Sequence, residues 1–170
     1  MNKAFIISSK VPTFHLDSYE KGRLFEEYII KLFNKKYFYL KQWRKSQKFD
    51  DSYSIIDSVY PDIEMELVFT GRRNFRFAVE CKWKQNFING KIEWASDDKI
   101  CSYRIFQDRV RIPVFIAIGI GGEPDNPEKL FLTPLNSIYM KNELFESDLI
   151  PFERSPRRRF YYDYMQLSLF

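Results

Sequence analysis

The sequence has little of what several common classes of functional site require. Its 170 residues contain one histidine, His15, and two cysteines, Cys81 and Cys101, which form no CxxC or Cys/His cluster. A structural zinc site is therefore disfavoured and reduced thiols are expected. A serine-based catalytic triad is not credible with this single histidine, and the chain has no GxxxxGK[ST] loop for binding phosphates.

Long hydrophobic runs are also missing. The longest, residues 114–120 (VFIAIGI), is too short to span a bilayer, and residues 1–9 lack the apolar stretch of a signal peptide. We therefore expect a cytoplasmic protein without a membrane segment. Apolar residues make up 45% of the chain and no interdomain linker is present, so we expect one domain, residues 1–170, with its own core.

What the chain does have is a set of charged residues inside apolar segments. Residues 60–84 contain two apolar stretches separated by a glycine turn, and the second stretch includes Glu80 and Lys82. Alternation of side chains along a strand places these two on one face, about 6 to 7 Å apart. Burying two charges without partners is costly, so the pattern indicates a functional site. The alternative is an ion pair at the solvated end of a strand.

The two stretches are expected to pair as a hairpin. In residues 62–69 the first three even positions are acidic and the odd ones are mostly apolar, and in residues 75–84 the polar residues again fall mainly at even positions. If the even positions share a face, the numbers of paired residues must add to an even value. That requires a turn of three or five residues, or a bulge, near Gly71. Glu66 is expected to pair with Arg76.

This hairpin would gather three carboxylates. With Glu64 opposite Glu80, Asp62 lies opposite Lys82 and beside Glu80. Like charges this close are tolerable only with a cation between them. Asp62 and Glu80 could therefore hold a divalent cation, while Lys82 could position or deprotonate a water, or stabilise charge on a phosphate.

A helix expected at about residues 18–34 supplies a further acid. Its apolar residues recur at helical spacing, and Glu26 falls at the border of the resulting stripe while Glu27 points to solvent. A carboxylate at that border can reach a site on the sheet below. The alternative for Glu26 is a boundary residue paired with a lysine or arginine.

The remaining elements complete an αβββαβ order. Besides the first helix, we expect a second helix at about residues 96–110. Strands are expected at about residues 37–44, 62–69, 75–84, 113–119 and 129–133. Because residues 113–118 form an unbroken apolar strand, the sheet should be covered on both faces. An α/β protein with a mixed central sheet flanked by helices follows.

Four of these residues, Pro61, Asp62, Glu80 and Lys82, resemble the signature of the PD-(D/E)xK, or restriction-endonuclease-like, nuclease superfamily. The spacing of Gly22 and Glu26 is similar to the helix motif of archaeal Holliday-junction resolvases and Mrr-type restriction nucleases. The resemblance covers about residues 18–133 and leaves about 134–170 as a C-terminal extension. It implies a restriction-endonuclease-like αβββαβ core.

The resemblance also implies a function, a Mg²⁺- or Mn²⁺-dependent DNA endonuclease that hydrolyses phosphodiester bonds. Asp62, Glu80 and the backbone carbonyl of Cys81 would bind the metal, Lys82 would act on water or phosphate, and Glu26 would assist.

Many members of the superfamily carry a further glutamine or lysine on the second helix. Gln107 and Lys99 are the candidates here, but spacing does not choose between them. Two other readings stay open, a catalytically silent nuclease-like module that binds nucleic acid or protein, and a metal-free protein-interaction domain.

The expected partner is DNA, although the net charge is only +4. Local basic clusters carry the expectation, because lysine and arginine bind phosphates and aromatic rings stack on bases. Lysines surround the first strand, and arginines at the hairpin tip and near the C-terminus are the candidates for nucleic-acid binding: Arg72, Arg73, Arg157, Arg158 and Arg159. The alternative for each cluster is a solvated surface, and for the C-terminal arginines a packing role. A homodimer is compatible with this reading.

Overall fold

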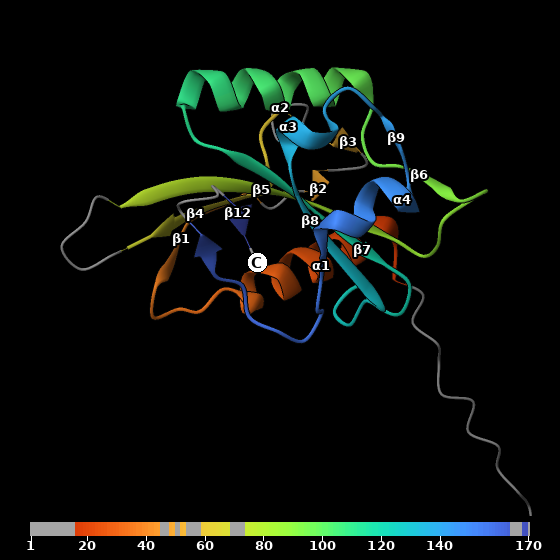
Figure 1. Ribbon diagram of the computed structural model, residues 1–170, viewed down its shortest axis with the longest axis horizontal. Coiled ribbons are helices and arrows are strands. Elements are labelled where there is room, and N and C mark those ends of the chain that lie inside the picture. Colours follow the sequence, from red (N-terminus) through yellow and green to blue (C-terminus); the bar gives the residue numbers. More distant parts are fainter. Residues whose placement is uncertain are drawn as a thin grey trace, which may run out of the picture.

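The computed structural model describes residues 16–44, 48–49, 52–53, 59–68, 74–163 and 168–169. Its centre is a six-stranded mixed sheet, with helix α1 (Ser18–Leu32) on one face and helix α2 (Asp97–Val110) on the other (Figure 1). The α/β architecture expected from the sequence, a mixed sheet flanked by helices, is confirmed.

The sheet has the strand order β1-β4-β5-β7-β8-β10. Only the central pair, β5 with β7, is parallel, and the other four pairs are antiparallel. The bounds of the strands are β1 Phe38–Trp43, β4 Ile63–Leu67, β5 Phe75–Lys84, β7 Val114–Ile120, β8 Lys129–Pro134 and β10 Glu153–Arg154. The last strand comes from the expected C-terminal extension, so that segment contributes to the main sheet.

Helix α1 starts at a reciprocal cap. The Asp17 carboxylate accepts the backbone N–H of Glu20 at 2.8 Å, and the Glu20 carboxylate accepts that of Asp17 at 2.9 Å. The helix then packs Phe25 and Ile29 onto the sheet, where both are fully buried. Phe25 lies so close to Gly119 of β7 that a Cβ atom there would come within 2.4 Å of its ring.

Helix α2 covers the opposite face. Its buried residues Ile100, Tyr103 and Phe106 recur at helical spacing, and the helix ends at Arg111 in the left-handed conformation, with φ 57°. Between the two helices every residue of β7 is buried, as expected for a strand covered on both faces.

Several short elements were not predicted. A separate two-stranded sheet pairs β6 (Lys91–Glu93) with β9 (Glu143–Phe145). It lies beside an Asn89-Gly90 turn in which both residues have positive φ. The others are β2 Lys48–Phe49, β3 Ser52–Tyr53, α3 Leu135–Ile138, α4 Glu146–Leu149, the 3₁₀ turn η2 Ile150–Phe152, β11 Tyr162–Asp163 and β12 Ser168–Leu169.

The predicted register of the hairpin is correct in which residues share a face, but it is displaced by two residues. The pairs between β4 and β5 join residues whose numbers add to an even value, as predicted, but Glu64 lies opposite Ala78 and not opposite Glu80. The alternation of polar residues constrains only which face they share, so a shift by two residues satisfies it equally well.

Some predictions fall on residues that the structure does not describe. The turn near Gly71, with Arg72 and Arg73, lies outside the described residues, as do His15 and residues 1–9. In the part of the chain that is described, no helix is both long enough and apolar enough to cross a membrane.

Candidate active site

Asp62 stands directly before β4 and next to β5. Because Ile63 pairs with Val79, one further step places Asp62 level with Glu80, rather than with Lys82 as predicted. Its carboxylate oxygen Oδ2 accepts the backbone N–H of Cys81 at 2.8 Å. The Asp62 side chain thus accepts a backbone N–H of β5 that a longer β4 would have accepted with a backbone carbonyl. This contact brings Asp62 beside Glu80, as the sequence suggested.

Glu80 is the most deeply buried acid of the group, with 2% of its surface exposed. Its oxygen Oε1 accepts a hydrogen bond of 2.6 Å from the hydroxyl of Tyr103 on α2, and it also pairs with the ammonium of Lys82. The second oxygen, Oε2, is buried and has no hydrogen-bond partner among the described residues. A buried carboxylate oxygen without a partner is costly, so this atom is the strongest sign of an external ligand.

Lys82 stays charged in this setting. Burial acts to lower its pKa, but the charges of Glu80 and Asp62 and the hydrogen bond to Glu80 raise the pKa above its ordinary value. A lysine held in the ammonium form is a poor base. Of the two roles considered from the sequence, the geometry therefore favours stabilisation of charge over deprotonation of water.

Glu26 reaches the same place from α1. It is 9% exposed, and its Oε2 accepts the indole N–H of Trp43 at 2.6 Å. Its pKa is raised from 4.5 to about 7, with burial as the largest cause. The charge of Glu80 also raises the pKa, and the Trp43 hydrogen bond acts to lower it. Its hydrogen-bond partner is thus an indole and not a lysine or arginine. Glu27 is half-exposed and lies 3.9 Å from Arg23.

The electrostatics join these residues into one site. The pKa of Asp62 is well above its usual range, mainly because of burial and also because of the charges of Glu80 and Glu26. The charge of Lys82 and the hydrogen bond from the Cys81 N–H act to lower this pKa. Three of the predicted residues, Glu26, Glu80 and Lys82, therefore lie close enough to the fourth, Asp62, for their charges to shift its pKa.

The backbone of Cys81 also faces this site. In a strand, the N–H and C=O of one residue point toward the same neighbouring strand. The Cys81 N–H donates to Asp62, whereas the N–H of Ala78, an even-numbered residue of the same strand, donates to the Pro113 carbonyl on the β7 side. The Cys81 carbonyl is thus directed toward Asp62. Burial, followed by the nearby acids, raises the pKa of its thiol, so the sulfur stays neutral.

These donors suit a hard cation. Carboxylate and carbonyl oxygens are the ligands that Mg²⁺ and Mn²⁺ prefer, and Mg²⁺ is usually held by one or two carboxylates with waters and phosphates completing the shell. No three His, Cys, Asp or Glu side chains in the described part of the chain are arranged so that together they could hold a metal ion. A site here would therefore rest on two carboxylates and the Cys81 carbonyl.

Several expected contacts are different. Glu66 lies opposite Arg76 in the β4–β5 register, but its carboxylate forms an ion pair with Lys41 at 3.2 Å. The guanidinium of Arg76 forms its ion pair with Glu64 at 2.7 Å. The side chain of Gln107 bonds the backbone N–H of Val114 at 3.0 Å and Asn136 at 2.9 Å, so it ties α2 to the following elements.

Sequence reasoning missed Tyr103, which is the residue of α2 that contacts Glu80. Lys99 lies one helical turn before it. Trp43 was missed as well. A signal existed for both, because a buried tyrosine or tryptophan usually finds a hydrogen-bond partner for its polar atom.

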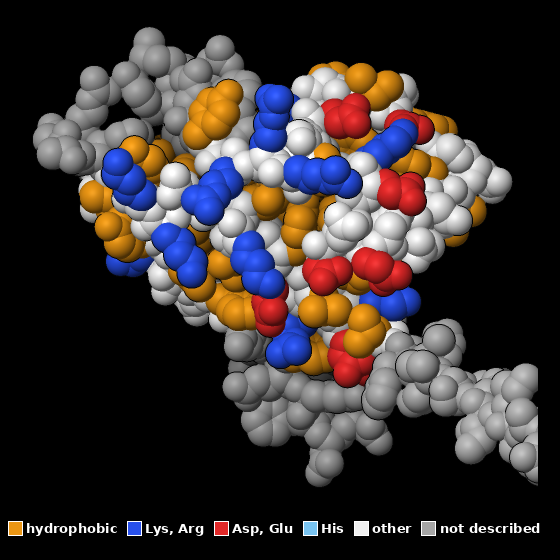
Figure 2. Space-filling view, turned by 90° about the horizontal axis from the view of Figure 1, so that it is seen from below, with side chains coloured by type: hydrophobic (Ala, Val, Ile, Leu, Met, Phe, Trp, Pro, Cys, Tyr) orange, Lys and Arg blue, Asp and Glu red, His pale blue; other side chains and the backbone are white. Residues whose placement is uncertain are grey.

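The arginines near the C-terminus are exposed at Arg157, Arg158 and Arg159. The segment around them is anchored, because Phe160 is buried in the core and donates its backbone N–H to Leu32 at 2.9 Å. On the face seen in Figure 2, Lys and Arg side chains predominate on the left, and Asp and Glu side chains lie mainly on the right and along the lower edge.

No protein-family model matches the sequence, and no curated protein matches it either. Among solved structures, the chain is similar to Hjc, a Holliday junction resolvase from the hyperthermophilic archaeon Archaeoglobus fulgidus. The TM-score is 0.52 at 15% identity, over 83% of this chain and 99% of that chain. At this identity the likeness shows the fold alone, and the restriction-endonuclease-like fold expected from the sequence is confirmed.

Proposed function

We propose that this protein is a divalent-metal-dependent DNA endonuclease of the PD-(D/E)xK type. The observation that carries the proposal is the oxygen Oε2 of Glu80, which is buried and has no hydrogen-bond partner among the described residues. Glu80 lies level with Asp62, on a fold shared with a junction resolvase. The carboxylates of Asp62 and Glu80 and the Cys81 carbonyl, with the cationic Lys82 nearby, are the types of group that hydrolysis of a phosphodiester requires.

Asp62, Glu80 and the Cys81 carbonyl would hold Mg²⁺ or Mn²⁺. When bound, such an ion supplies an activated water and neutralises charge on the phosphate. Glu26, whose carboxylate accepts the indole N–H of Trp43, is the third acid of the site.

The chain's own groups supply the rest. Lys82, held as an ammonium by Glu80 and Asp62, stabilises negative charge that develops on the phosphate oxygens. Tyr103 fixes the carboxylate of Glu80. Glu26, with a pKa of about 7, exchanges a proton near neutral pH and is the candidate to accept one from an attacking water.

The test is cleavage of a panel of linear, nicked, four-way-branched and single-stranded DNA with Mg²⁺ and with Mn²⁺. Wild-type protein should cleave at least one substrate, and Asp62→Asn should lose that activity while it still binds DNA. Glu66→Gln, which changes an acid of the adjoining strand β4 outside the site, is the matched control and should cleave normally. Cleavage by Asp62→Asn at the wild-type rate would exclude the proposed site.

A second candidate is a catalytically silent module that binds nucleic acid. It is favoured by the arrangement of Glu80, whose Oε1 already has Lys82 and Tyr103 as partners, so its charge is compensated without a metal. Calorimetric titration with Mn²⁺ separates the two candidates. The nuclease should show a site that Asp62→Ala removes, whereas the silent module should bind DNA without any heat from the metal.

A further inference from the structure

Asp62 depends on its neighbours for its orientation, because it stands just outside β4. Two peptide groups flank its Cα atom, that of Pro61 before it and its own carbonyl after it. Both are held by Arg44, the residue that follows β1. The backbone N–H of Arg44 donates to the Asp62 carbonyl at 2.8 Å, and its side-chain Nη1 donates to the Pro61 carbonyl at 2.7 Å.

Fixing both peptide planes fixes the direction in which the Asp62 side chain leaves the backbone. A peptide group is planar, and proline has a fixed φ. Once the carbonyls on either side of Asp62 are held, its φ and ψ have little freedom, and the direction of its Cα–Cβ bond is set. That direction is the one in which Asp62 meets the Cys81 N–H.

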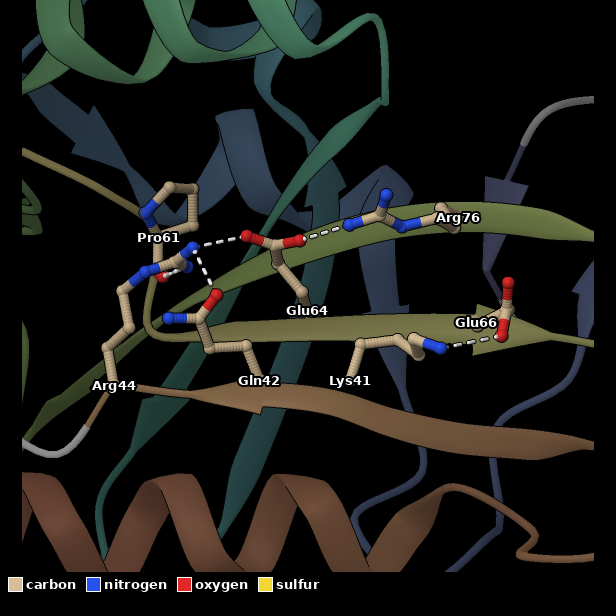
Figure 3. A network of polar contacts seen from close by, with 7 residues as sticks. All are labelled: Lys41, Gln42, Arg44, Pro61, Glu64, Glu66 and Arg76. Carbon is tan, nitrogen blue, oxygen red and sulfur yellow. Dashed lines mark hydrogen bonds and ion pairs between the residues drawn. The ribbon is translucent and has the colours of Figure 1, made fainter.

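The guanidinium of Arg44 is itself held on every side. Its Nη2 pairs with Glu64 and donates to Gln42 at 3.0 Å, as Figure 3 shows. The group also lies over two rings, at 5.1 Å from the centre of Tyr60 and 5.8 Å from that of Phe106 on α2. Only 12% of the Arg44 side chain is exposed. A planar fork with several donors can make these contacts together, whereas a lysine cannot.

Arg76 completes the network without contacting Asp62. It pairs with the other oxygen of Glu64 at 2.7 Å, from the neighbouring strand β5 (Figure 3). Glu64 thus lies between two arginines, one of which also reaches the candidate site. Arg76 therefore offers a matched comparison, since its loss breaks an ion pair with the same acid and leaves the carbonyls of Pro61 and Asp62 untouched.

We propose that Arg44 is a positioning residue that holds the Asp62 carboxylate in place for the site. The expected effect of Arg44 on cleavage rests on the proposed function, whereas its expected effect on the position of Asp62 does not. The adjacent residue Trp43 orients Glu26 from the opposite face, so two consecutive residues at the end of β1 position two acids of the site.

The test uses the backbone N–H of Cys81 as a reporter, because Asp62 accepts it. Amide hydrogen exchange is measured by NMR in the wild type, Arg44→Met, Arg76→Met and, as the reference for a lost acceptor, Asp62→Ala. Arg44→Met keeps the backbone N–H and the apolar stem. We expect the Cys81 amide to exchange at least ~10-fold faster in Arg44→Met, approaching the Asp62→Ala rate, and to be unchanged in Arg76→Met.

Two other amides serve as internal controls for a general loss of stability. The amide of Val79, which pairs with Ile63 of β4, and that of Ile116 in buried β7 should keep their wild-type exchange rates in Arg44→Met. An unchanged Cys81 amide in Arg44→Met overturns the proposal. So does an equal acceleration at Cys81 and Ile116, or an effect in Arg76→Met as large as in Arg44→Met.

An activity measurement separates this proposal from the proposed function. In a wild-type enzyme that cleaves DNA, Arg44→Met and Arg44→Lys should lower kcat by at least ~10-fold with little change in DNA binding, because a small displacement of a reacting group is enough. If the wild type cleaves nothing, the nuclease assignment fails, whereas the exchange result at Cys81 still decides whether Arg44 positions Asp62.

Discussion

The hydroxyl of Tyr103 donates a hydrogen bond of 2.6 Å to Oε1 of Glu80, and both groups are buried. This bond joins α2 to the candidate site, as the bond from Trp43 to Glu26 joins β1 and α1. The two acids are thus held from opposite faces of the sheet. Each accepts a hydrogen bond from an aromatic residue, Tyr103 in the core and Trp43 packed against it.

Tyr103→Phe removes this bond and keeps the ring. Glu80 then stays buried with Lys82 as its one described partner, so we expect the free energy of unfolding to fall by about 1 to 3 kcal/mol. Urea denaturation measures the change. The control is Tyr37→Phe, whose side chain is exposed, and it should leave stability unchanged. Equal stability of Tyr103→Phe and wild type would show that the bond contributes nothing.

Lys82→Ala should abolish cleavage, because it removes the ammonium that we propose stabilises charge on the phosphate. The substitution should also destabilise the fold, because Glu80 would lose the counter-ion of its buried carboxylate. The free energy of unfolding should fall by about 3 to 5 kcal/mol. We therefore pair it with the double variant Glu80→Gln, Lys82→Met.

The double variant has no buried charge at either position, so it should regain most of the lost stability and remain inactive. Urea unfolding and a cleavage assay on purified protein measure the two properties. Cleavage by folded Lys82→Ala at the wild-type rate would exclude a catalytic role for the lysine.

Glu26 should make stability depend on pH. Burial and its neighbours raise its pKa from 4.5 to about 7, so between these values the folded state keeps a proton that the unfolded state has released. The free energy of unfolding therefore falls as pH rises through this window, by about 3 kcal/mol from this group.

The comparison is between wild type and Glu26→Gln, unfolded with urea at pH 4.5 and pH 7.5 in buffer with a chelator. The difference between the two proteins should change by about 3 kcal/mol across the window. Glu27→Gln, a surface acid beside Arg23, should track the wild type. A constant difference between wild type and Glu26→Gln would mean that the pKa of Glu26 is ordinary.

Local patterns were enough to predict the long elements. The strand expected at residues 75–84 is Phe75–Lys84, and the helix expected at about 96–110 is Asp97–Val110. Alternation and helical spacing are properties of neighbouring residues, so these predictions needed no tertiary information. The same alternation placed Asp62, Glu80 and Lys82 together, because it decides which residues share a face.

Contacts between distant segments could not be predicted. The absolute register of β4 on β5 is set where Asp62 accepts the Cys81 N–H and Arg44 holds the Asp62 carbonyl, and neither bond leaves a local pattern. Tyr103 sits in a run of buried helix residues and resembles an ordinary core position. The small β6–β9 sheet joins segments about fifty residues apart, such as Lys91 and Phe145.

Two glycines should respond to alanine in opposite ways. Gly22 lies inside α1, and a Cβ atom there would meet nothing within 4 Å, so Gly22→Ala should raise stability by up to about 1 kcal/mol through helix propensity. Gly119→Ala should destabilise, because its Cβ would lie 2.4 Å from the Phe25 ring. Thermal unfolding of both variants tests the packing of α1 on β7, and a neutral Gly119→Ala would contradict it.

The C-terminal arginines offer a test of DNA binding that does not involve the metal. Arg157, Arg158 and Arg159 are exposed, while their neighbours are anchored, since Phe160 is buried and the Pro156 carbonyl accepts the Tyr28 hydroxyl at 2.5 Å. An anchored segment with exposed guanidinium groups loses little entropy on contact with phosphates, so it suits a clamp on a substrate strand.

Replacing the three exposed arginines, Arg157, Arg158 and Arg159, with alanine should weaken DNA binding at moderate salt. The slope of log affinity against log salt should become flatter by about two to three units, because each phosphate neutralised contributes about 0.9 on duplex DNA. The control is Lys91, Lys129 and Lys141 changed together to alanine, with the same loss of charge. These lysines already pair with Glu143, Glu146 and Asp148, so the slope should be nearly unchanged. Calorimetric titration with Mn²⁺ should be unaffected in both triple variants, because neither touches the acids of the site. If the arginine variant keeps the wild-type slope, the segment packs against α1 and takes no part in binding DNA.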